Sequence, residues 1–201
     1  MHGLKASYSK ALAGLAICLG ILALNLNLAA SGRVVHDDST PPPAGGHAMA
    51  FALSSKSFPN EGDIPKKFTC DGADVSPELS WQDPPANSKA FALIADDPDA
   101  PAGTWTHWVL YDLPGDVKNL QEGISKQEEL PNGARQGRND FRKIGYNGPC
   151  PPPGKPHRYY FKLYALDARL NLKAGAGRGE VERAMQAHIL GKAEWMGRYK
   201  R

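Results

Sequence analysis

The sequence predicts a mainly β domain of the sandwich type with one or two short helices. The chain has 17 prolines and 21 glycines among 201 residues, so turns are frequent and extended segments are short. About seven segments have the alternating or continuous apolar pattern of strands, and a helical pattern occurs only near the C-terminus. Many short strands separated by turn residues are typical of β-sandwiches.

The first segment, residues 1–31, has the pattern of a secretory signal. Lys5 and Lys10 precede the apolar run 11–24, and small residues end the segment. The run is shorter than the roughly 20 apolar residues of a membrane span. We therefore expect export to the periplasm or the outside, with cleavage of this segment. An uncleaved membrane anchor is the second reading, and lipidation of Cys18 ranks third because a large Ile precedes it.

Residues 32–48 have the composition of a disordered linker. They contain three consecutive prolines and almost no large apolar side chains, so they cannot bury enough surface to fold. The folded domain is therefore expected over residues 49–201. Roughly 150 residues are enough for one domain with a hydrophobic core.

The charge pattern argues against a nucleic-acid partner. The formal net charge is +3, and the basic residues are scattered among acids with no run that could follow a phosphate backbone. The only membrane contact expected is through the N-terminal segment, if it stays uncleaved. No cofactor is expected.

Apolar patterns place the first strands of the domain. We expect a strand within 49–58 and short strands at 65–72 and 78–85, each closed by turn residues. The segments 89–97 and 106–115 are almost continuously apolar, which predicts strands buried on both faces.

The C-terminal part predicts a central strand, a helix and a last strand. Residues 157–167 alternate, so one face of this strand should carry Tyr159, Phe161, Leu163 and Ala165. Apolar spacing of about 3.6 residues predicts a helix over 179–190, capped by Gly191 and with His188 packed on its apolar face. Residues 192–200 then predict a terminal strand.

Two histidines begin strands directly after loops rich in proline and glycine. His107 lies shortly after the loop 97–103, and His157 follows the loop 148–156. Loops at the ends of sandwich strands are common positions for binding sites. On its own, a single strand histidine is usually an ordinary core or surface residue.

The neighbours of these histidines complete a small polar pocket. Residues two apart in a strand share a face, so Trp105 should accompany the first histidine and Tyr159 the second. Asp97 and Asp99 would bring carboxylates, although aspartates also stabilise turns by bonding nearby amides. The combination of imidazoles, carboxylates and aromatic walls predicts a site for a small polar ligand.

Four separated motifs in this order resemble the bacterial branch of the phosphatidylethanolamine-binding protein family, also called Raf kinase inhibitor-like proteins. They are FTCDGADVSPELSW (68–81), DDPDAPAGTWTHWVLYDLP (96–114), GYNGPCPPPGKPHRYYFKLYALD (145–167) and HILGKAEWMGRY (188–199). The resemblance covers Phe51 to Tyr199. It implies a β-sandwich of Greek-key-type sheets with a small pocket for phosphate-like anions and phosphorylated head groups.

The resemblance also implies which residues form that pocket. They are Asp97, Pro101, Trp105, His107, Gly148, Pro149, His157 and Tyr159. A pair of imidazoles can donate hydrogen bonds or carry positive charge toward an anion, and the backbone amide of Gly148 could add a donor. Asp97 would orient a histidine or bind the ammonium or hydroxyl part of a head group.

The expected function is therefore exported binding of a small anionic or phosphorylated ligand. No enzyme activity is expected, because a nucleophile motif such as GxSxG is absent from the sequence. The alternative is an inhibitor or regulatory interaction protein of the kinase- or protease-inhibitor type, whose pocket modulates contact with an unidentified protein partner. Only the family resemblance favours that alternative.

Two cysteines remain in the domain, Cys70 and Cys150. In an exported chain they could form one disulfide or stay as two buried thiols. Zinc held by Asp97, His107, His157 and a cysteine would use suitable ligand types. The spacing matches no metal-binding motif, so no metal is expected.

Overall fold

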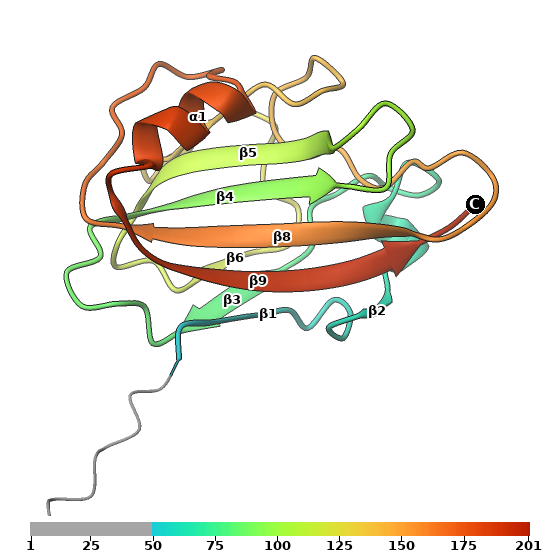
Figure 1. The fold of residues 1–201 in the computed structure, drawn as a ribbon, viewed down its shortest axis with the longest axis horizontal. Helices are drawn as coiled ribbons and strands as arrows, with labels where there is room; N and C mark the ends of the chain where they lie inside the picture. Colours follow the sequence, from blue (N-terminus) through green and yellow to red (C-terminus); the bar gives the residue numbers. More distant parts are fainter. Residues whose placement is uncertain (1–49) are drawn as a thin grey trace, which may run out of the picture. The chain divides into compact units, whose positions relative to one another are not determined.

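The computed structural model describes residues 50–201, and the predicted signal (1–31) and linker (32–48) lie outside that part. The described residues form a six-stranded sheet in the order β2-β9-β8-β4-β5-β7 and a three-stranded sheet in the order β1-β3-β6 (Figure 1). The strands are β1 (Ala52–Ser54), β2 (Gly62–Asp63), β3 (Leu79–Gln82), β4 (Ala90–Asp97), β5 (Trp105–Pro114), β6 (Asn119–Leu120), β7 (Arg135–Gln136), β8 (His157–Leu166) and β9 (Ile189–Tyr199). The prediction of a mainly β fold is confirmed.

The core lies on both faces of the large sheet. β4 is buried at every position because β8 and β5 flank it and both of its faces are covered. Phe91 and Leu93 contribute to the core cluster shared with the three-stranded sheet, and Ala92 and Ile94 to the cluster beside helix α1 (Arg178–Met185). Each large apolar side chain buried in this way contributes about 1.5–3 kcal/mol. This explains why the segment is a nearly unbroken apolar run.

β8 has the alternation that the sequence predicts. The face with Tyr159, Phe161, Leu163 and Ala165 is buried, whereas Arg158 is exposed and Tyr160 and Lys162 are half-buried. β4 pairs with one edge of β8 and β9 with the other, both antiparallel. The prediction of a central strand is confirmed.

The strand predicted at 65–72 is wrong. The segment contains a 3₁₀ helix, Lys66–Phe68, followed by turns. Phe68 is its only large apolar side chain and is buried, and the Thr69 hydroxyl donates to the Lys66 carbonyl at 2.9 Å. One buried apolar residue without apolar alternation does not define the face of a strand.

The predicted C-terminal helix is too long. α1 ends at Met185, and β9 begins at Ile189, so His188 is in the connecting turn and Gly191 lies inside β9 rather than capping the helix. Pairing with β8 reaches back to Ile189, which extends the strand into the segment with helical spacing. Tertiary pairing overrides local periodicity here.

α1 is also far too short to cross a membrane. None of the helices within residues 50–201 has the length and apolar character that a membrane span needs.

Several loops lie together at one end of the strands of the large sheet. β4 ends at Asp97 where β5 begins, and antiparallel pairing places the start of β8 beside them. The loops 98–104 and 148–156 therefore lie at the same end of the sheet, near the C-terminus in Figure 1. The pocket described next lies at this end of the sheet.

Candidate ligand-binding pocket

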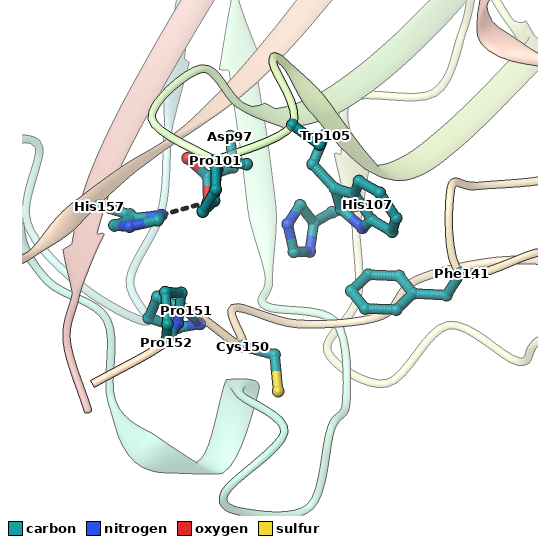
Figure 2. A pocket seen from close by; sticks show the side chains of 11 residues that line it. Asp97, Pro101, Trp105, His107, Phe141, Cys150, Pro151, Pro152 and His157 are labelled. Carbon is teal, nitrogen blue, oxygen red and sulfur yellow. Dashed lines mark hydrogen bonds and ion pairs between the residues drawn. The ribbon is translucent and has the colours of Figure 1, made fainter. Parts of the chain in front are cut away.

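A cavity of about 240 Å³ lies between the loops at this end of the large sheet (Figure 2). Five of the eight predicted site residues line it, from the end of β4, the loop 98–104 and the starts of β5 and β8. The lining consists of Asp97, Ala100, Pro101, Ala102, Trp105, His107, Phe141, Cys150, Pro151, Pro152 and His157. Its walls are mostly apolar, with the carboxylate and two imidazoles as the ionisable groups.

A β-bulge brings His107 into the pocket. Along the β4–β5 ladder, Ala95 pairs with Trp108 and Asp96 with Thr106, which leaves His107 as an extra residue on β5. A bulge of this kind bends the strand and redirects a side chain, and bulges are frequent beside binding sites. Trp105 and His107 both reach the cavity from this short stretch.

Asp97 and His157 form a buried pair on the opposite wall. His157 Nδ1 lies 2.8 Å from Asp97 Oδ2, the contact drawn dashed in Figure 2. The other carboxylate oxygen, Oδ1, accepts the backbone N–H of Asp99 at 2.8 Å. Because the carboxylate can only accept, Nδ1 of the ring carries the hydrogen. Asp97 therefore fixes the orientation of the ring and leaves Nε2 for a ligand.

His107 is fixed by a backbone carbonyl instead. Its Nδ1 lies 2.7 Å from the carbonyl oxygen of Asn147, and the ring packs edge-on against Phe141 and Tyr159, with centroids 5.3 and 5.2 Å away. Burial lowers the pKa of His107 below its ordinary value, because the charged imidazolium would lose its hydration. The pocket thus has one neutral, buried imidazole facing one paired to a carboxylate.

Tyr159 lies beneath the pocket rather than in its lining. The side chain is buried in the main core, and its hydroxyl makes no hydrogen bond within residues 50–201. Burial and the nearby charge of Asp97 raise the pKa of Tyr159 above its ordinary value, so the hydroxyl keeps its proton. Tyr159 is linked to the pocket by its ring contact with His107 and by the Asp97 carboxylate near its hydroxyl.

Gly148 and Pro149 lie behind the pocket wall and not on it. The N–H of Gly148 donates to Asp74 Oδ1 at 2.6 Å, so this amide is already used. A Cβ on Gly148 would come within 2.1 Å of the Phe68 carbonyl, so only glycine fits this close approach of two backbones. The Pro149 carbonyl accepts the N–H of Cys70 at 3.1 Å. These contacts hold the wall in place.

A disulfide joins Cys70 to Cys150 at the same wall. Both cysteines are exposed, and Cys150 lines the cavity together with the prolines that follow it. The bond links residues 80 positions apart, so it ties the segment after the 3₁₀ helix to the loop that precedes β8.

Sequence reasoning did not place six of the eleven lining residues in the pocket, and one of them, Cys150, was expected only as a possible disulfide partner. Pro151 and Pro152 come directly after the predicted GPC stretch, and Ala100 and Ala102 flank the predicted Pro101, so a wider reading of the same loops would have found them. Phe141 lies in a polar segment without a recognised motif. Only the fold brings it against Trp105 and His107.

The described residues offer no metal site. Within residues 50–201, no three His, Cys, Asp or Glu side chains are grouped so that they could hold a metal ion. The disulfide also removes Cys70 and Cys150 as thiolate ligands.

Two packed sheets, with a cavity between the loops at one end of the larger one, place the protein among the β-sandwiches. Residues 54–200 match the family model described as phosphatidylethanolamine-binding protein. The chain belongs to the phosphatidylethanolamine-binding protein family, which confirms the resemblance seen in the sequence motifs.

Relatives and solved structures agree with this assignment. A UPF0098 protein of Aquifex aeolicus is 50% identical over 160 residues, covering 79% of this chain and 92% of the relative. One from Methanothermobacter thermautotrophicus is 48% identical over 149 residues, covering 74% and 98%. A Chlamydia trachomatis structure described as a phosphatidylethanolamine-binding protein homologue has 41% identity and a TM-score of 0.69, covering 76% of this chain and 98% of that one. Escherichia coli YbcL, described as a member of the mammalian family, has 32% identity and a TM-score of 0.71, with coverage of 75% and 98%.

Proposed function

We propose that this chain is a binding protein for a small anionic or phosphorylated ligand, held in the pocket between Asp97, His107 and His157. The observation that carries the proposal is the arrangement of the two imidazoles. Each uses Nδ1 for a fixed acceptor inside the protein, at 2.8 and 2.7 Å, and so has Nε2 left for a ligand. When His157 is protonated, Asp97 stabilises its charge and Nε2–H becomes a donor to an anion.

The walls suit the organic part of such a ligand. Pro101, Pro151 and Pro152 line the cavity with Phe141 and Trp105, which gives rigid apolar surfaces around the few polar groups. Small-ligand sites commonly have this composition. Prolines restrict the loops before binding, which lowers the entropy lost when a ligand orders them.

Binding without catalysis is the simpler role for this lining. It contains no serine, threonine or free cysteine that could act as a nucleophile beside the imidazoles. The family is named for binding, and the names of the relatives above are not enzyme names.

Equilibrium titration with O-phosphoethanolamine and inorganic phosphate tests the proposal. Saturable binding is expected, and His157→Gln should weaken it by about 10- to 100-fold because a charge-assisted hydrogen bond is lost. His188→Gln is the matched control, since His188 Nδ1 also contacts an aspartate, Asp167, at 2.7 Å but outside the pocket. Equal weakening by both variants, or no saturable binding by the wild type, would contradict the proposal. Turnover of matching phosphate esters would contradict the assignment as a binder.

We also propose that the protein works outside the cytoplasm. The apolar run near the N-terminus supports this, and an exposed disulfide is compatible with an oxidising compartment. Thiol alkylation of the protein taken from fractionated cells tests it. Unmodified Cys70 and Cys150 in the exported fraction are expected, whereas fully alkylated cytoplasmic protein would contradict the proposal.

A further inference from the structure

We propose that the pocket selects an oxyanion that itself carries an O–H group, such as hydrogen phosphate or a phosphate monoester monoanion, and that His107 is the specificity-determining residue. The inference rests on the proposed function, because it names the chemical form of the ligand bound at the same site. It follows from which atoms of the pocket can donate and which can only accept.

His107 presents an acceptor to the cavity. A carbonyl oxygen can only accept, so the 2.7 Å contact with Asn147 places the ring hydrogen on Nδ1. In the neutral ring, Nε2 then has a lone pair and no hydrogen. His107 is 4% exposed, and its burial lowers its pKa, which favours this neutral form. A ligand oxygen without a hydrogen could not form a hydrogen bond with this nitrogen, because both atoms would present lone pairs.

The charges around the ring add to this selection. Asp97 at the end of β4 is the carboxylate that lines the cavity, and it opposes a second negative charge there, whereas the neighbouring Asp96 is neutralised by Lys162 and Arg178. On β8 the titratable neighbours are His157 and Tyr159, and Tyr159 keeps its proton. The loop that packs from the other side carries Asp140, whose carboxylate accepts the N–H of Thr106 beside the ring. It also carries Phe141 and Asn147, which are uncharged.

No permanent cation compensates the Asp97 carboxylate in the cavity. Among the described residues that line it, none is a lysine or arginine. When His157 is protonated, its ring, 2.8 Å from the Asp97 carboxylate, supplies a positive charge to the cavity. The complementary ligand therefore offers one acceptor oxygen to His157 Nε2–H and one O–H donor to His107 Nε2. A hydrogen phosphate or a monoester monoanion has both, whereas sulfate and phosphate diesters have only acceptors at neutral pH.

Two matched pairs of probes test this selection in titration calorimetry. Hydrogen phosphate and sulfate at pH 7 have the same shape and can have the same charge. Methyl phosphate and dimethyl phosphate at pH 5.5 are both mainly monoanions and differ in the O–H group. Because a buried acceptor left without a hydrogen costs about 1–3 kcal/mol, the O–H member of each pair should bind about 10- to 100-fold more tightly.

His107→Gln tests the residue assigned to this selection. A glutamine amide can turn either an N–H or a carbonyl toward the ligand, so the preference within each pair should fall to nearly equal binding. His188→Gln, outside the pocket, should keep the wild-type preference. If His107→Gln does not fold, ¹⁵N NMR of the wild type still decides the point. The Nε2 signal should be that of an unprotonated nitrogen without ligand and change when phosphate is added.

The outcomes separate this inference from the proposed function. Equal binding of sulfate and phosphate by the wild type, or a protonated Nε2 in the empty pocket, would overturn the selection and leave anion binding intact. No binding of any of the four probes would overturn both. Preference for phosphate that persists in His107→Gln would overturn the role of His107.

Discussion

Asp96 and Asp97 are consecutive residues of β4 with opposite surroundings. The Asp96 carboxylate is fully buried and contacts two permanent cations, Lys162 Nζ at 2.8 Å and Arg178 Nη1 at 2.9 Å. The Asp97 carboxylate is almost as buried, but its side-chain partner is the ring of His157, which is not a permanent cation. Strand geometry sends the two carboxylates to opposite faces of the sheet. A carboxylate neutralised by permanent cations supports the fold, whereas the carboxylate paired with His157 lies in the proposed ligand site.

The largest expected effect comes from removing the disulfide, whose Cys150 lines the pocket together with Asp97. Replacing Cys70 and Cys150 by alanine should lower the free energy of unfolding by about 4 kcal/mol, because the closed loop spans 80 residues. Chemical denaturation measures the loss. Hydrogen exchange should accelerate in the loop 148–156 while the amides of α1 keep their protection at matched stability.

Reduction of the wild-type protein provides the control for this double variant. It should reproduce the same loss of stability without changing any side-chain volume. Equal loss of protection at α1 and at the pocket wall would show that the disulfide does not act locally.

The second largest effect is expected for Asp96→Asn. The variant leaves Lys162 and Arg178 without their shared carboxylate, and removal of one partner from a buried ion pair costs about 3–5 kcal/mol. The cations are 20% and 28% exposed, which places the expected loss at the low end, about 3 kcal/mol. Chemical denaturation at neutral pH measures it.

Asp97→Asn is the matched comparison for that variant. Asparagine can still accept the hydrogen bond from His157, so the loss of stability should be only about 0.5–1.5 kcal/mol. Ligand binding should weaken in this variant and remain unchanged in any folded Asp96 variant. The reverse order of the two stabilities would contradict the distinction between the two faces.

A smaller effect is expected from the pH dependence set by His107. Its folded pKa lies below the ordinary value of 6.5, so the unfolded chain takes up a proton at higher pH than the folded protein does. Stability from this group is therefore complete above about pH 6.5 and is lost as the pH falls below it. One proton limits the slope to about 1.4 kcal/mol per pH unit.

Denaturation curves of the wild type and of His107→Gln between pH 7.5 and 5 test this. The variant should lose less stability on acidification than the wild type does. A steeper loss in the variant would contradict the direction of the shift.

The smallest effect is expected at Asp99, on the rim of the pocket. The hydrogen bond from the Arg158 side chain lowers the pKa of Asp99 from 3.8 to about 2. Its contribution is thus present above about pH 4 and is lost as the pH falls toward 2. Because this pair is exposed and screened by solvent, Asp99→Asn should change stability less than any variant above. NMR titration of the Asp99 carboxyl checks the pKa directly.

The long strands could be predicted from the sequence because their signal is continuous. The segments 89–97, 106–115 and 157–167 each carry enough apolar residues in register to specify a buried strand. The segment 65–72 carries one buried aromatic, and 186–190 belongs to both a helical pattern and the paired β9. In both cases, contacts with distant residues decided the structure.

The site could be predicted in part for a similar reason. Asp97, Pro101, Trp105, His107 and His157 line one cavity because they belong to loops that start or end strands. The bulge at His107 depends on pairing between β4 and β5, and the approach of Phe141 depends on where its loop crosses β5. Neither is encoded in local spacing. That the five residues contact a ligand stays a prediction.

The disulfide closes a covalent ring that includes one of the two pocket loops and excludes most of the other. Loop 98–104 lies inside the ring closed by Cys70 and Cys150, whereas 151–156 lies outside it. A single backbone cut at Pro101 would leave all parts of the domain in one covalent molecule. A cut at Gly154 would separate β8 and β9, and with them His157, from the rest of the chain. One wall of the pocket can thus be nicked without loss of connectivity, and the other depends on an intact backbone.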